Sequence, residues 1–121
     1  MATTIDIGDL KVRSPDGKVG VDQHPYYLSL KDKDAHMYEN FVKKSNRQSK
    51  KESAPWSGYY KLAKKIHREG FIYDINHPII IKHKRGKWYA CHGRHRICIL
   101  RYLYGRKSVI VLDKFKDNKY I

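Results

Sequence analysis

The sequence is short of acidic residues. Only 12 of its 121 residues are Asp or Glu, against 26 Lys and Arg, and the formal net charge at pH 7 is +14. A field of this sign concentrates phosphates at the surface and favours nucleotide or polyanionic partners, although a solvated lysine-rich surface has the same composition. The scarcity of acids also argues against clustered carboxylates, with which nucleases usually hold their catalytic metal ions.

Long apolar runs and cysteines are scarce as well. No stretch reaches the roughly 18 apolar residues of a membrane-spanning helix, and the N-terminus lacks the apolar run of a signal peptide. The cysteines, at positions 91 and 98, do not make the framework of a secreted disulfide-rich protein. We therefore expect no membrane partner and a cytoplasmic location, which is the host cytoplasm if this short lysine- and tyrosine-rich chain is viral.

Both cysteines belong to a short run of residues that could bind zinc. Cys91, His92, His95 and Cys98 are residue types that bind zinc. Their spacing crosses an expected strand-to-helix junction and matches no standard zinc pattern. We therefore expect no metal site there, and expect the thiols to pack within apolar faces.

The first half of the chain alternates between apolar patterns and polar stretches. A near-alternation of Ile and Leu with polar residues predicts a strand over residues 3–12, which ends at the turn residues 14–17. Apolar residues at helical spacing predict a helix over 34–44. Residues 43–53 contain no apolar side chain, and we expect a mobile basic loop at about 43–55 that could contact phosphate backbones.

The second half has a clearer pattern. Ser57 can cap a helix with Tyr59, Leu62, Ala63 and Ile66 on one face, which ends at Gly70. The segment 78–91 predicts a β-hairpin, 94–104 an amphipathic helix that ends at a glycine, and 108–112 a buried strand. This order predicts one α+β domain over residues 1–121, with a small mixed sheet packed against helices.

The local oddity is the charge at the start of the helix 94–104. Arg94, His95 and Arg96 fall in the first turn, where the helix dipole favours acids. A phosphate that accepted the N–H groups and both guanidinium groups would offset this cost, and Gly93 would let its oxygens approach the backbone. Solvation of all three side chains is the alternative.

The segment 78–113 resembles the ParB/sulfiredoxin superfamily. In that family an apolar strand beginning with Pro-Ile, a hairpin, an Asp/Gly-Gly-x-His/Arg-Arg box and a helix precede a last apolar strand. The box here is His92-Gly93-Arg94-His95-Arg96. Residues 62–70 are similar to the helix that ParB-like domains place before Pro-Ile, and residues 7–10 are similar to their first strand.

The resemblance implies a stand-alone ParB-like domain whose box binds the phosphates of ATP or another NTP with Mg²⁺. His92 precedes the glycine, where the family often has an acid, and we count it among the nucleotide-binding residues. Sulfiredoxins carry their catalytic cysteine where this chain has Arg94, so sulfinic acid reduction is not expected. We also expect this chain to lack the helix-turn-helix and dimerisation domains of chromosome-partition ParB.

Hydrolysis or transfer of a phosphoryl group requires a carboxylate or another general base. ParB-like kinases supply a Glu from before the box, which makes Glu39 the candidate, with His95 as the second catalytic residue. Asp22 and Glu69 are weaker alternatives. Trp56 and Trp88 could stack on a base or pack, and packing is expected for the tryptophan of the hairpin.

The leading interpretation is a nucleotide-binding ParB-like domain that acts as an NTPase or a kinase. The alternative is a DNA-binding module or a non-specific nuclease of ParB-like type, which the net charge and the basic segment 43–51 favour. A third possibility is a domain that senses a nucleotide without turnover.

Overall fold

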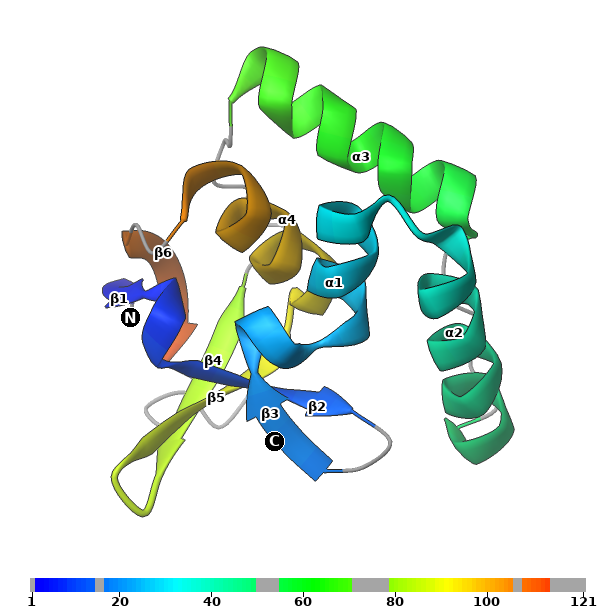
Figure 1. Cartoon of the computed structure of the whole chain (residues 1–121). Helices are drawn as coiled ribbons and strands as arrows, with labels where there is room; N and C mark the ends of the chain where they lie inside the picture. Colours follow the sequence, from blue (N-terminus) through cyan, green and yellow to red (C-terminus); the bar gives the residue numbers. More distant parts are fainter. Residues whose placement is uncertain (1, 15–16, 50–54, 71–78, 106–107, 114–121) are drawn as a thin grey trace.

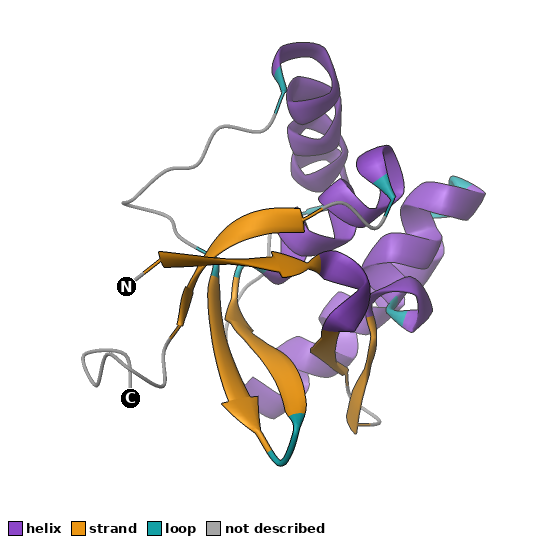
Figure 2. Cartoon of the chain, turned by 90° about the vertical axis from the view of Figure 1, so that its left-hand side faces the viewer, coloured by secondary structure: helices purple, strands orange, loops and turns teal. Residues whose placement is uncertain are grey.

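The computed structural model of this chain describes residues 2–14, 17–49, 55–70, 79–105 and 108–113. In these ranges a six-stranded sheet has the order β1-β6-β4-β5-β2-β3, and Figures 1 and 2 show the helices gathered on one side of it. The strands are β1 (Ala2–Asp6), β2 (Leu10–Ser14), β3 (Gly17–Gly20), β4 (Ile80–Lys84), β5 (Lys87–His92) and β6 (Ser108–Asp113). The helices are α1 (Pro25–Asp32), α2 (Ala35–Ser49), α3 (Trp56–Glu69) and α4 (Arg94–Tyr104), with short 3₁₀ turns η1 (Ile7–Asp9) and η2 (Val21–Gln23).

The sheet is mixed. β1 with β6, β4 with β5, and β2 with β3 pair antiparallel, whereas β4 with β6 and β2 with β5 pair parallel. The β1–β6 and β2–β5 pairs join strands from the two halves of the chain, so the sheet forms only when both halves have come together. The predicted α+β class with a mixed sheet is confirmed.

The prediction of a single strand over residues 3–12 is wrong. The 3₁₀ turn η1 separates β1 from β2, because the Asp6 carboxylate accepts a hydrogen bond from the Gly8 N–H at 2.8 Å and caps the turn. The two strands then occupy different parts of the sheet, β1 beside β6 and β2 between β5 and β3. The apolar pattern continues through the break because Ile5 before the turn, Ile7 within it and Leu10 after it are all buried.

The helices of the first half differ from the prediction in two places. α1 was not predicted; it begins at Pro25, whose fixed φ suits the first helical position. α2 continues to Ser49, so the predicted loop is wrong from Lys43 as far as that residue. Its lysines, arginine and glutamine have good helix propensity even without an apolar face. The remainder of the predicted loop, residues 50–54, lies outside the described residues.

Most of the later elements follow the sequence. α3 ends at Gly70 as predicted, although its N-cap residue is Pro55 and Ser57 lies inside the first turn. The β4–β5 hairpin, helix α4 and strand β6 are confirmed, and Gly105 ends α4 with a φ of 73°. Pro78, the expected start of the first hairpin strand, is outside the described residues.

The core lies between the sheet and the helices and is rich in tyrosine. Leu10, Val12 and Ile81 from the sheet pack in one cluster with Ile97 and Leu100 from α4. Beside them the helices contribute rings that contact one another, which we call the aromatic cluster: His24, Tyr26, Tyr38, Phe41, Tyr59 and His95. The first residues of α4 therefore lie against this cluster.

Candidate functional site

The predicted phosphate-binding box lies at the junction of β5 and α4. Gly93 is the N-cap residue of α4 and has left-handed backbone angles, φ 92° and ψ 22°. A Cβ atom at this position would lie 2.9 Å from Ile79 Cγ1 and 3.3 Å from Ile79 Cα. The turn and the packing of the buried Ile79 thus require glycine here, whether or not a phosphate approaches the backbone.

The N-terminus of α4 has no side-chain cap among the described residues, and its first turn contains no acid. The first intrahelical hydrogen bond runs from the Ile97 N–H to the Gly93 carbonyl at 2.8 Å. In any α-helix the N–H groups before this point have no acceptor within the helix. The box therefore combines a positive helix end with half-buried Arg94 and Arg96.

Arg94 turns toward the aromatic cluster. Its Nη1 donates a hydrogen bond to the Arg13 carbonyl oxygen at 3.1 Å. The guanidinium carbon lies 5.0 Å from the ring centroid of Tyr26 and 5.1 Å from that of Phe41, which is the distance of a cation–π contact. The side chain is thus held between β2 and the helices, with one of its five N–H donors used by the backbone.

His95 lies within the aromatic cluster. Its ring stacks on Tyr26 with centroids 4.4 Å apart and meets Tyr59 edge-on at 5.2 Å. Its Nε2 shares a hydrogen bond with the Tyr38 hydroxyl at 3.1 Å. Burial, and then the neighbouring Arg94 guanidinium, lower the pKa of His95 to about 4, so the ring is neutral at physiological pH.

His24 is a residue of this site that the sequence did not single out. It is fully buried, and its Nδ1 accepts a hydrogen bond from the Tyr26 N–H at 3.0 Å, which caps α1. The ring proton is therefore on Nε2, which donates to the Arg13 carbonyl at 2.9 Å. Burial is the main cause that lowers the pKa of His24 to about 4. The only local signal was the proline that follows it, which suits the start of a helix.

The arrangement limits the chemistry open to His95. A histidine with a pKa near 4 is a weak general base at neutral pH and carries no proton to donate as an acid. Burial also raises the pKa values of Tyr38 and Tyr59, which keeps both hydroxyls protonated. The geometry favours a role for His95 in holding the first turn of α4 against the helices.

The remaining predicted residues are spread over the surface. His92 is exposed at the end of β5, opposite Ile80, and Arg96 is half-buried in the first turn of α4. Glu39 is exposed on α2, although it directly follows Tyr38, whose hydroxyl contacts the box. Asp22, an alternative to Glu39, is likewise exposed, on η2.

Glu69, the other alternative, lies at the end of α3. Its carboxylate accepts a hydrogen bond from Arg68 at 3.3 Å, and both side chains are exposed. α3 contacts α4, but Glu69 is exposed at the C-terminal end of α3. Trp56, which meets the aromatic cluster, lies at the N-terminal end of that helix. Among the carboxylates predicted from the sequence, Glu39 is the one with a sequence neighbour in contact with the box.

Within the described ranges no three His, Cys, Asp or Glu side chains gather as metal ligands. Cys98 is buried in the core on α4, and burial raises the pKa of its thiol to about 12, so it stays protonated. Cys91 is half-buried on β5, a separate element. The run of cysteines and histidines is therefore divided between strand β5, which holds Cys91 and His92, and helix α4, which holds His95 and Cys98.

Both tryptophans pack against other rings. Trp56 meets Tyr38 and Tyr59 with centroids 5.6 and 6.0 Å apart. Trp88 lies 4.6 Å from His83, its cross-strand partner on β4. The packing expected for Trp88 is confirmed, and Trp56 extends the aromatic cluster toward α3.

Comparison with known proteins adds no relative: no family model, no curated protein and no solved structure matches this chain. In the described part of the chain, no helix has the length and apolar character needed to span a membrane.

Proposed function

We propose that this protein binds the phosphates of a nucleotide at the N-terminus of α4. The observation that carries the proposal is a helix that begins with two arginines in its first turn, with neither an acid nor a capping side chain there among the described residues. Each exposed cation at such a position costs a few tenths of a kcal/mol. A bound phosphate reverses that balance, because it accepts the N–H groups of the turn and pairs with the guanidinium groups.

The two arginines have different tasks in this proposal. Arg94 is oriented by the Arg13 carbonyl and by the rings of Tyr26 and Phe41, so its position is fixed before a ligand arrives. Arg96 lies two residues further along the same turn and is the main guanidinium partner of the phosphate. His95 holds the turn to α2 through Tyr38.

The resemblance to ParB-like domains supports a nucleotide as the ligand. The strand, hairpin, box, helix and strand follow one another as in that family, from β4 through α4 to β6. In this proposal Mg²⁺ accompanies the nucleotide, and the domain hydrolyses the NTP or transfers its phosphate. Glu39 is the proposed carboxylate that orients or deprotonates the attacking group, since α2 is the helix whose Tyr38 contacts the box.

Isothermal titration with ATP, CTP, GTP and ADP in Mg²⁺ tests the proposal, at a salt concentration that screens non-specific attraction. We expect saturable binding of at least one nucleotide. Arg96→Ala should abolish binding while circular dichroism shows that the fold is retained, and Arg96→Lys should restore binding only in part, because lysine lacks the planar fork. Unchanged affinity in Arg96→Ala would show that the site is elsewhere.

Turnover is tested separately from binding. Glu39→Gln should retain nucleotide affinity and lose phosphate release or transfer, because only the carboxylate can act as the base. Ser57→Ala, which alters another exposed helix position, is the control and should leave both quantities unchanged. Binding without turnover in the wild type would leave a nucleotide sensor.

A further inference from the structure

The four strands β2, β3, β4 and β5 contain six Lys and Arg residues and no Asp or Glu. Residues directly opposite one another on neighbouring strands have side chains on the same face of a sheet. Lys84 is opposite Lys87, and Arg13 is opposite Lys18. Tyr89 is opposite Lys82 of β4 on one side and Lys11 of β2 on the other. Its side chain therefore shares a face with the cations of both the β4–β5 and the β2–β3 hairpins.

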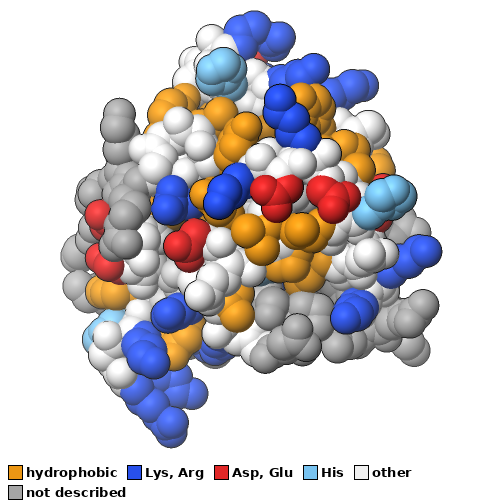
Figure 3. Space-filling view, viewed as in Figure 1, with side chains coloured by type: hydrophobic (Ala, Val, Ile, Leu, Met, Phe, Trp, Pro, Cys, Tyr) orange, Lys and Arg blue, Asp and Glu red, His pale blue; other side chains and the backbone are white. Residues whose placement is uncertain are grey.

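All six cations therefore lie on one face, which we call the basic sheet face: Lys11, Arg13, Lys18, Lys82, Lys84 and Lys87, with Tyr89 among them. The alternate residues of the same strands, such as Val12 and Ile81, belong to the core on the helix side. In Figure 3 the Lys and Arg side chains at the lower left gather over the end of the β4–β5 hairpin of Figure 1.

This face breaks local rules of sheet design. Like charges directly opposite each other destabilise a sheet, and both Lys84–Lys87 and Arg13–Lys18 are such pairs. The turn between β4 and β5 has Arg85 at φ 52°, where Asn, Asp or Gly is the usual residue. Departures of this kind are expected where a function requires them.

Protection of sheet edges does not account for the lysines. Edge strands often carry lysine because its charge discourages pairing with another chain. In this sheet β3 is at an edge, but β4, β5 and β2 each lie between two strands. Five of the six cations are therefore on interior strands.

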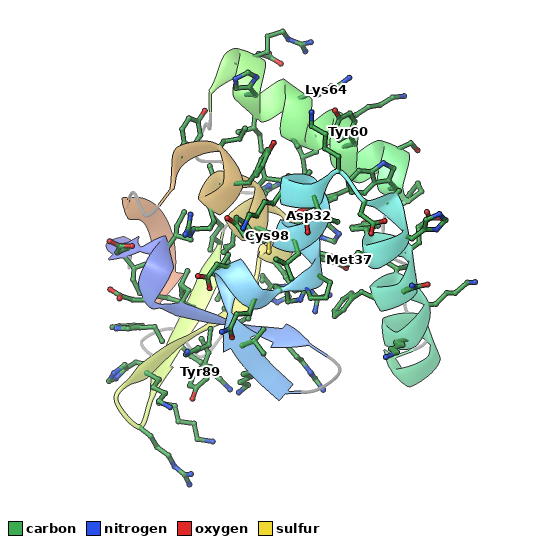
Figure 4. The ribbon with its side chains drawn as sticks, viewed as in Figure 1. Asp32, Met37, Tyr60, Lys64, Tyr89 and Cys98 are labelled. Atoms are coloured by element: carbon green, nitrogen blue, oxygen red, sulfur yellow. The ribbon has the colours of Figure 1, made fainter. Side chains whose placement is uncertain are left out.

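Tyr89 places an aromatic ring in the middle of this charge. The Lys18 ammonium lies 4.2 Å from the centroid of its ring, over one of its two faces, which is the distance of a cation–π contact. Figure 4 shows Tyr89 at the opposite end of the molecule from Tyr60 and Lys64 of α3. An aromatic ring surrounded by cations on a sheet face suits a base that stacks while its phosphates contact lysines.

We propose that the basic sheet face binds single-stranded nucleic acid. A single strand exposes both phosphates and the faces of its bases, whereas a duplex hides the base faces from Tyr89. The site is separate from the nucleotide site at α4 and does not depend on it.

Fluorescence anisotropy with labelled single-stranded DNA and RNA of about 12 nucleotides tests the proposal. We expect the slope of log affinity against log salt concentration to be about 1.4 shallower in the double variant Lys84→Gln/Lys87→Gln than in the wild type. Each phosphate contact to a single strand contributes about 0.7 to this slope, and the variant removes two such contacts. The fold should survive, since this change removes a repulsion between exposed side chains. The matched control is Lys61→Gln/Lys65→Gln on the exposed side of α3, which has the same loss of charge and should keep the slope.

Tyr89 variants test the stacking. Tyr89→Leu should weaken binding about tenfold, and Tyr89→Phe should restore it, because stacking needs the ring and not the hydroxyl. Equal loss of slope in the α3 control would overturn the proposal, since net charge would then be the cause. Tighter binding of a duplex, or binding of phosphatidylserine vesicles without single strands, would also overturn it.

Discussion

Acid should destabilise this protein through two histidines of the aromatic cluster. The pKa values of His24 and His95 are lowered from 6.5 to about 4 in the folded chain, in both cases mainly by burial. The unfolded chain therefore binds protons that the folded chain does not, as soon as the pH falls below the unfolded pKa. The stability contributed by the neutral rings is complete above pH 6.5 and is lost as the pH falls toward 4.

The size of the effect follows from the shifts. A difference of one pKa unit corresponds to about 1.4 kcal/mol, so each histidine accounts for about 3 kcal/mol across this window. Since small domains have only about 5–15 kcal/mol of stability, the two together would remove much of it. Protonation would also place a cation beside Arg94, which contacts the same rings.

Urea unfolding at several pH values between 7 and 4 measures the effect through the extrapolated free energy. His24→Asn retains an acceptor for the cap of α1, and His95→Gln retains a partner for Tyr38. Each variant should be less stable than the wild type at pH 7. As the pH falls, its free energy of unfolding should decrease by about 1.4 kcal/mol less per pH unit than that of the wild type. The control His67→Gln, exposed on α3, should keep the wild-type dependence. A free energy of unfolding that is flat from pH 6.5 to 4.5 would show that these two histidines are not buried as neutral rings.

Two substitutions test the packing around the site. Gly93→Ala should cost about 2–5 kcal/mol, because it adds a clash with Ile79 to a left-handed backbone. Gly105→Ala has a positive φ but open space around the Cβ, so it should cost about 1–2 kcal/mol, and similar values for the two would exclude the clash. Tyr59→Phe should cost about 1–2 kcal/mol in urea unfolding, since the hydroxyl donates to the buried Tyr26 carbonyl at 2.9 Å; no loss would show that the bond is replaced.

Local patterns predicted much of the second half of the chain. Gly70 and Gly105 end their helices, and Gly86 lies in the turn of the hairpin. All three positions have a positive φ, which glycine adopts readily. The apolar spacing of α3 and α4 identified the sides that face the core. Glycine was expected at position 93 so that a phosphate could approach its backbone, whereas in the structure the left-handed turn and the contact with Ile79 require it.

The errors occurred where a side chain decides the local conformation. Asp6 caps η1 and divides a pattern that alternates like one strand, and His24 caps α1 in a stretch without helical periodicity. Histidine is an uncommon N-cap residue, so Pro25 was the only local indication that a helix begins here. The extent of α2 was missed because helix propensity, without an apolar face, continues it to Ser49.

Charge, helix propensity and turn residues are local properties, so they predict a basic α+β chain with an arginine-rich turn at the start of a helix. The surroundings of that turn depend on long-range packing: Arg94 reaches the carbonyl of Arg13, 81 residues earlier, and His95 enters a cluster built from three helices. Long-range packing also brings cations from both ends of the chain onto one sheet face. That depends on the parallel pairing of β2 with β5, and the register of such a long-range pair is set by packing of the core face and not by either strand alone.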